Sequence, residues 1–199
     1  MSVGDIDIRT VSGAAVTPWL DDLAALRIRV FRDYPYLYDG SADYERRYLT
    51  AYARSPGSLF VLALAGERVV GAATALPLID AEPEFRAPFE ARGMAAEQVL
   101  YFGESVLDQG HRGLGIGHRF FDRREAHARD LDLPVTAFCA VVRGPGHPAC
   151  PPDYRPLDPF WRARGFQPED GMTTEYRWRD LGDTGESPKT MQFWLRKSR

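Results

Sequence analysis

The most informative stretch of the chain covers residues 101–118, which read YFGESVLDQGHRGLGIGH. An apolar strand segment runs into a glycine-dense turn, and a helical segment follows at once. Glycines permit unusual dihedral angles and let a ligand approach the backbone closely. The free N–H groups at the start of a helix, together with the helix dipole, favour an anion there. The stretch therefore predicts a phosphate or pyrophosphate cradle, to which Arg112 adds a fork of donors.

Three other interpretations of this turn are weighed against its position and spacing. Its glycines could simply permit a tight strand-to-helix connection. A dinucleotide fingerprint needs a β-α-β unit near the N-terminus and an acidic residue about 20 positions later, whereas this turn lies mid-chain after a predicted hairpin. A Walker loop needs Lys followed by Ser or Thr, but Gly117 is followed by His118 and Arg119. Neither nucleotide motif fits.

The rest of the chain predicts an alternation of helices and strands around this turn. No linker marks a domain boundary, so we expect one domain over residues 1–199, built on a mixed α/β sheet with helices on both faces. The expected strands are residues 6–11, 59–65, 69–76, 99–107, 135–142, 173–179 and 190–195, and the expected helices are residues 19–30, 41–55, 85–91, 115–130 and 158–164.

Composition narrows the classes of protein. The 199 residues are 44% apolar and 27% charged, with a net charge of −3, which argues against a nucleic-acid binder that relies on a basic field. No apolar run is long enough to span a membrane, and no signal peptide is recognisable. The two cysteines, Cys139 and Cys150, form neither a disulfide framework nor a metal motif. We expect a cytoplasmic protein, and the preference for Arg over Lys is typical of a GC-rich bacterial genome.

The turn also carries a resemblance to a known family. The segment from Arg112 to Gly117 matches the Gln/Arg-x-x-Gly-x-Gly/Ala cofactor motif of the GNAT superfamily of N-acetyltransferases, and the Gly165-Phe166 pair falls where that family has it. The resemblance covers essentially the whole chain. It implies a mixed, mostly antiparallel seven-stranded sheet flanked by about four to five helices, with the fourth and fifth strands splayed apart. It also implies acetyl-CoA as cosubstrate and no metal.

The resemblance assigns the cofactor site residue by residue. The pantetheine arm would pair with the end of the fourth strand at Val106 and Leu107, where the splay leaves backbone N–H groups without partners. The pyrophosphate would be held by the backbone of the glycine turn, namely Arg112, Gly113, Leu114, Gly115, Ile116 and Gly117, with His118 just after it.

Acyl transfer to an amine requires a base and a route for the leaving thiolate. Glu104 is the best candidate base, since the family often places a carboxylate there and an acid on a central strand is costly to bury. It could instead form a salt bridge with an arginine. Strand alternation predicts that Phe102, Glu104 and Val106 share one face. The family's usual acidic Tyr is replaced by Trp161, so Tyr154 is the candidate acid, with water as the alternative.

Other residues receive weaker assignments. Arg124 is expected to pair with a carboxylate, and Cys139 to be a small core residue. Aromatic and acidic residues on the first helices and after the third strand could hold a cationic amine or simply cap the domain: Phe31, Tyr34, Tyr36, Tyr38, Asp39, Glu82 and Glu84. We therefore expect a monomeric or homodimeric N-acetyltransferase for a small-molecule or protein amine. A non-catalytic acyl-CoA-binding module is the alternative, and neither nucleic acid nor a membrane is an expected partner.

Overall fold

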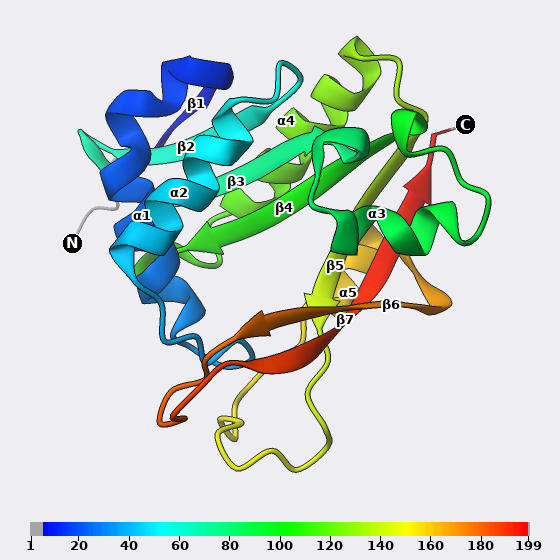
Figure 1. Ribbon diagram of the computed structural model, residues 1–199. Coiled ribbons are helices and arrows are strands. Elements are labelled where there is room, and N and C mark those ends of the chain that lie inside the picture. Colours follow the sequence, from blue (N-terminus) through cyan, green and yellow to red (C-terminus); the bar gives the residue numbers. More distant parts are fainter. Residues whose placement is uncertain (1–5, 199) are drawn as a thin grey trace.

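Seven strands form one sheet in the computed structural model, which describes residues 6–198 (Figure 1). Their order across the sheet is β1-β2-β3-β4-β5-β7-β6, and neighbours are antiparallel except for the parallel pair β4 and β5. The strands are β1 (Ile6–Val11), β2 (Leu59–Ala65), β3 (Arg68–Pro77), β4 (Val99–Leu107), β5 (Val135–Val141), β6 (Gln167–Trp178) and β7 (Ser187–Lys197). The mixed, mostly antiparallel seven-stranded sheet that the resemblance implied is confirmed.

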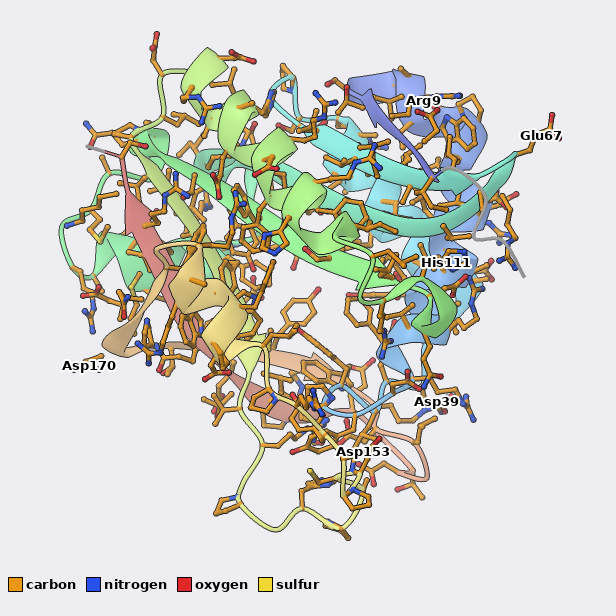
Figure 2. All side chains as sticks on the ribbon, turned by 180° about the vertical axis from the view of Figure 1, so that it is seen from behind. Arg9, Asp39, Glu67, His111, Asp153 and Asp170 are labelled. Atoms are coloured by element: carbon orange, nitrogen blue, oxygen red, sulfur yellow. The ribbon has the colours of Figure 1, made fainter. Side chains whose placement is uncertain are left out.

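Helices cover both faces of the sheet, as expected. They are α1 (Leu20–Phe31), α2 (Ala42–Ala53), α3 (Pro83–Glu90), α4 (Ile116–Asp130) and α5 (Asp158–Ala163). One apolar core joins the sheet to α1, α2 and α3 through residues such as Leu26, Leu49 and Phe89. The second core lies on the opposite face, where Phe120 of α4 and Phe160 of α5 pack. Figure 2 views the molecule from this α4 side.

The sequence pattern located most elements but misjudged both ends of the chain. It missed a 3-10 helix at Gly13–Trp19, and it began the sixth strand at residue 173, whereas β6 begins at Gln167. The pairing of β6 with β7 is interrupted between Pro168 and Thr173, and Gly171 has a φ of 65°. Proline and glycine are typical turn residues, so a bulge inside a long strand resembled a loop in the sequence.

Strands β4 and β5 diverge after a short paired region. Only Val99–Tyr101 of β4 pairs with residues of β5, namely 135–137. Within the described residues, the later part of β4 has no strand partner on that side, and the ribbons separate there (Figure 1). Unpaired backbone groups must find other partners. The fold therefore leaves this edge of β4 without a strand partner where the resemblance predicted the splay.

A β-bulge in β4 overturns the predicted alternation of side chains. Ala73 of β3 is opposite Ser105, but Ala75 is opposite Phe102, so β4 has one extra residue between the two positions. A bulge shifts the alternation by one. Phe102 accordingly packs in the core under α4, whereas Val106 packs in the core under α1. The prediction that Phe102, Glu104 and Val106 share a face was wrong.

Arg124 stabilises this bulge from beneath. Its side chain is buried, and its guanidinium donates to the backbone carbonyls of Thr74 (3.4 Å) and Glu104 (3.2 Å) and to the hydroxyl of Ser105 (2.8 Å). It also lies over the ring of Phe102. Burial lowers the pKa of Arg124 to about 9. The prediction that Arg124 pairs with a carboxylate was wrong. Its guanidinium instead donates to the backbone carbonyls of Thr74 and Glu104, which lie at the bulge where the strand pairing is interrupted.

Arg143 ties the chain after β5 to two distant segments. It forms a two-point ion pair with Asp180 (2.7 and 3.0 Å) and donates to the carbonyls of Pro35 and Tyr36. Burial alone would raise the pKa of Asp180, but the hydrogen bond and charge of Arg143 and the charge of Lys189 lower it overall. This contact fixes the loop after α1 against the β6–β7 hairpin.

Asp180→Asn is expected to lower the free energy of unfolding at pH 7 by about 1–3 kcal/mol, because two buried cations lose their anionic partner. The folded pKa lies below the unfolded value of about 3.9, so this stabilisation is present above that pH and is lost as the pH falls through the folded pKa. Urea denaturation should show a smaller difference in the free energy of unfolding between variant and wild type at pH 3 than at pH 7. The exposed Asp183→Asn serves as control, and an equal loss in both variants would contradict the prediction.

Candidate active site

The glycine turn forms an open cradle at the start of α4. Gly113 and Gly115 have φ angles of 79° and 75°, and a Cβ added at either would meet nothing within 4 Å. Gly115 is also the N-cap of α4, without any acidic side chain in the first turn. Left-handed dihedrals are costly for other residues. The turn therefore needs glycine for its shape, and it leaves the N–H groups at the helix start accessible to an anion.

Arg112 is held beside this cradle rather than inside it. Its Nε donates to the carbonyl of Leu107 (3.2 Å), and its Nη2 lies 3.5 Å from the Asp33 carboxylate. The side chain is largely exposed on the same surface as the turn. His118 lies one turn into α4, with its ring edge-on to Phe160 at 4.9 Å. The predicted cofactor-binding residues are thus contiguous in space, from the end of β4 to the first turn of α4.

Gly115→Val is expected to weaken CoA binding at least tenfold, since a left-handed β-branched residue is strained by about 1–2 kcal/mol and the turn must rearrange to relieve it. The rearrangement would move the N–H groups away from the pyrophosphate. Isothermal titration with CoA measures the effect. Gly110→Ala is the matched control, because Gly110 is equally open but is not left-handed. Equal affinity in wild type and Gly115→Val would rule out this cradle.

Glu104 lies in the bulge and points toward α1, on the face opposite α4. Its Oε2 is 2.7 Å from Nη1 of Arg27, and Nε of Arg27 pairs with Glu45 of α2. All three side chains are buried, and Glu45 is 0% exposed. The structure thus joins the candidate base to a buried cluster that spans α1, α2 and β4.

The charges in this cluster are coupled. Burial alone would lower the pKa of Arg27, but the carboxylates of Glu104 and Glu45 raise it well above its ordinary value. The guanidinium also lies over the rings of Tyr48 (4.4 Å) and Phe31 (5.1 Å). Arg27 is therefore a permanent cation between two carboxylates. An arginine partner for Glu104 was the alternative that the sequence left open, and this contact does not exclude proton transfer.

Tyr154 lies in the long segment between β5 and α5. Its ring stands edge-on to Tyr34 at 4.7 Å, and Tyr34 also contacts His147 at 5.7 Å. Figure 2 labels its neighbour Asp153 at the same end of the molecule as Asp39. Burial raises the pKa of Tyr154, and the electrostatic influence of the neighbouring Tyr34 raises it further. The tyrosine therefore keeps its proton at neutral pH, as a proton donor must.

Trp161 and Cys139 are packing residues. The indole of Trp161 contacts Phe138 (5.0 Å) and Trp194 (5.1 Å) in the core under α4. Cys139 is buried, and its Sγ lies 3.1 Å from the hydroxyl of Tyr101. Burial raises the pKa of this thiol to about 12. The expectation that Cys139 is a core residue is confirmed.

A cavity of about 850 Å³ opens above Glu104, between the α1–α2 pair and the β6–β7 hairpin. Most of the predicted acceptor residues line it: Phe31, Tyr36, Tyr38, Asp39, Glu82 and Glu84. Tyr34 does not, since it packs against Tyr154 outside the lining. Small-molecule sites typically have volumes of about 300–1,000 Å³. The cavity is thus large enough for a small acceptor and reaches the candidate base.

Sequence reasoning missed the half of this cavity that β6, β7 and the interior of α2 contribute. Tyr44 and Tyr176 join their hydroxyls at 2.8 Å across the opening, and Trp178 and Glu175 line the same wall. No role was predicted for Arg27 or Glu45. The available signal was their place on the apolar face of each helix, because Arg27 lies one helical turn after Leu23 and Glu45 one turn before Leu49.

A scan against protein families identifies the chain. The model of the Acetyltransferase (GNAT) family matches residues 23–151, which include most of α1, all of β4 and the glycine turn. The chain belongs to the GNAT acetyltransferase family. The resemblance inferred from the turn is confirmed, and acetyl transfer from acetyl-CoA is the chemistry of this family.

Solved structures share the fold at low sequence identity. A ribosomal-protein-alanine N-acetyltransferase from Brucella melitensis is 18% identical, with a TM-score of 0.61 over 96% of this chain and 99% of that one. An N-acetyltransferase from Staphylococcus aureus Mu50 is 13% identical, with a TM-score of 0.62 over 98% and 99% of the two chains. A Salmonella typhimurium protein solved with its cofactor acetyl-CoA is 11% identical, with a TM-score of 0.60 over 98% and 95%. No curated protein matches the sequence.

The described residues fit acetyl-CoA. Along the chain, the bulge at Glu104 is followed by the unpaired end of β4 and then by the open cradle at Gly113 and Gly115. No group of three or more potential metal ligands occurs among residues 6–198. In the same range, no helix combines the length and apolar character needed to cross a membrane.

Proposed function

We propose that this GNAT protein is an N-acetyltransferase that moves an acetyl group from acetyl-CoA directly to an amine. The observation that carries the proposal is the continuity of the two half-sites. The glycine cradle leads through Val106 and Leu107 of β4 to the bulge, and the bulge places Glu104 in the wall of the acceptor cavity. A donor bound along β4 would therefore meet an acceptor bound in the cavity at Glu104.

Bound acetyl-CoA supplies a thioester carbonyl for attack by the amine, with the CoA thiol as the leaving group. Glu104 acts on the amine. An alkylammonium has a pKa of about 10.4 and must lose a proton before its nitrogen has a lone pair to attack with. Glu104, whose Oε2 lies 2.7 Å from Arg27, is the proposed acceptor of this proton through water. Arg27 fixes the side chain of Glu104, and Arg124 fixes its backbone carbonyl.

Tyr154 is the proposed proton donor to the leaving sulfur. It holds its proton at neutral pH, and its ring is held edge-on against Tyr34. The protons balance: Glu104 takes one from the ammonium through water and returns it to solvent, and the second, released from nitrogen as the amide forms, replaces the proton that Tyr154 gives to sulfur. A thiolate with an ordinary pKa of about 8.5 also leaves without much help, so Tyr154 contributes less than Glu104.

Whole-chain binding and turnover measurements test the proposal. Titration calorimetry should show acetyl-CoA binding, and a panel of amines should yield acetylated products by mass spectrometry. Mass spectrometry is preferred to thiol reagents because Cys150 is exposed and would react with them. Binding of acetyl-CoA without acetylation of any amine would favour a non-catalytic acyl-CoA-binding module instead. If acetyl-CoA does not bind, the proposal is wrong.

We also propose that residues 1–199 form a single acetyltransferase domain. The support is the sheet, which runs from β1 at Ile6 to β7 at Lys197 and whose two cores share every central strand. Limited proteolysis that released a stable fragment with CoA affinity would contradict this proposal.

A further inference from the structure

The backbone of Glu104 is held by two buried side chains from other elements. Its N–H donates to the hydroxyl of Thr74 on β3 (3.3 Å), and its carbonyl accepts from the guanidinium of Arg124 on α4 (3.2 Å). A bulge disrupts the regular ladder, and buried backbone groups there need other partners. The direction of the candidate base therefore depends on residues outside its own strand.

The bulge turns Glu104 away from α4. In a regular strand, residues two apart share a face, so Glu104 would share the face of Phe102, which packs in the core under α4. Instead, two residues of β4, Gly103 and Glu104, lie opposite one residue of β3. A Cβ added at Gly103 would lie 2.2 Å from the hydroxyl of Tyr52 on α2, and Glu104 contacts Arg27 on α1. Both bulge residues therefore face the α1–α2 side, which the glycine permits.

Arg124 binds this bulge from the α4 side. Its guanidinium also donates to the carbonyl of Thr74 (3.4 Å) and to the hydroxyl of Ser105 (2.8 Å), so it spans both strands. Its remaining hydrogen bond goes to the carbonyl of Phe120 on its own helix, and within residues 6–198 none of these bonds goes to a carboxylate. An apolar side chain would fill a core at lower cost than a buried cation. What arginine adds is a rigid fork that binds several oxygens at once.

The strand is fixed on either side of the bulge. Before it, Leu100 and Tyr101 pair with both β3 and β5. After it, the N–H of Asp108 donates to the carbonyl of Val70 at 2.8 Å, ahead of the glycine turn. A change at the bulge is therefore confined to residues 103–105 and leaves the CoA cradle in place.

We infer that Arg124 is a positioning residue, which holds the bulge and thereby directs Glu104 toward Arg27 and the acceptor cavity. This inference rests on the proposed function, in which Glu104 is the base. Arg124 is 1% exposed and does not belong to the cavity lining, so it acts through Glu104 rather than on a substrate. Loss of its guanidinium lets Glu104 leave Arg27, which slows proton transfer and leaves CoA binding unaffected.

Arg124→Met removes the fork and keeps most of the side-chain volume. We expect kcat for amine acetylation to fall at least about tenfold, and at most by the roughly 10²–10⁴-fold that a positioned base contributes. Calorimetric affinity for CoA should stay at the wild-type value. Arg123→Met is the matched control, because Arg123 is the preceding residue of α4 and is exposed. A wild-type kcat in Arg124→Met, or a parallel loss of CoA affinity, would overturn the inference.

A double variant separates positioning from general support of the fold. Arg124→Met should slow the Glu104→Gln enzyme no further, because residues that act as a unit give non-additive losses. Losses that multiply would show a structural role only and would overturn the inference.

If Arg124→Met does not fold, Arg124→Lys takes its place in every comparison. Lysine keeps the charge but lacks the planar fork, so a loss of kcat of about three- to tenfold is expected from the weaker hold on the bulge. This loss should again vanish in the Glu104→Gln background. A wild-type kcat in Arg124→Lys would then overturn the inference.

A crystal structure of the folded variant tests the inference without turnover. Glu104 should no longer lie within ion-pair distance of Arg27, which is 2.7 Å from its Oε2 in the wild type, and an unchanged pair would overturn the inference. If Glu104 leaves Arg27 in the variant but the wild type acetylates no amine, the proposed function fails and the positioning of Glu104 by Arg124 stands. If the wild type acetylates amines and the variant is equally fast, the inference fails alone.

Discussion

Glu104→Gln is expected to lower kcat/KM for amine acetylation about 10²–10⁴-fold, the usual contribution of a positioned base. Glutamine keeps the shape of the side chain and an oxygen that accepts from Arg27, but it cannot take a proton. The loss should therefore fall on turnover. Affinity for CoA should be unchanged, because the cradle lies beyond the end of β4, at residues 112–118.

The measurement compares initial rates with calorimetric CoA affinity for both forms. Glu97→Gln is a matched control, since Glu97 is an exposed carboxylate just before β4. An unchanged rate in Glu104→Gln would remove Glu104 as the base and leave water in that role. A parallel loss of CoA affinity would show that the substitution disturbs the bulge rather than the chemistry.

Arg27→Met is expected to lower the free energy of unfolding by about 3–5 kcal/mol, because it leaves the buried carboxylates of Glu45 and Glu104 without their cation. The arginine side chain is 9% exposed, and its partners are 0% and 4% exposed. Methionine approximates the stem of arginine in volume, so lost packing contributes little.

Urea denaturation of the variant and of Arg29→Met provides the comparison. Arg29 lies on the same helix and pairs with Asp108 at 2.7 Å, but its side chain is 52% exposed. An exposed pair contributes about 0–1 kcal/mol, so the control should lose little. Adding Glu45→Gln to Arg27→Met should restore part of the lost stability by removing one stranded charge. Equal losses in Arg27→Met and Arg29→Met would contradict the account of the buried cluster.

The local features of this protein were predictable because they depend on residues close together in the chain. Glycines at 113 and 115 determine the left-handed turn, and Ser41 determines the start of α2, where its side chain accepts from the backbone N–H of Tyr44. A continuous apolar run placed β2 at its observed bounds, and the apolar residues at both ends of β4 placed that strand. These patterns, with the order of elements, were sufficient to predict the family and the left-handed glycine turn before α4.

Tertiary structure decided the acceptor side. The direction of Glu104 depends on a bulge whose extra residue is visible only in the register of β4 against β3. Its ion pair with Arg27, which also pairs with Glu45, brings it together with residues 77 and 59 positions away in the chain. No local pattern encodes such a contact, because burial of a charge depends on what packs over it. The sequence by itself therefore determined the family and the shape of the glycine turn, and only the fold determined that Glu104 lies beside Arg27 in the lining of a cavity.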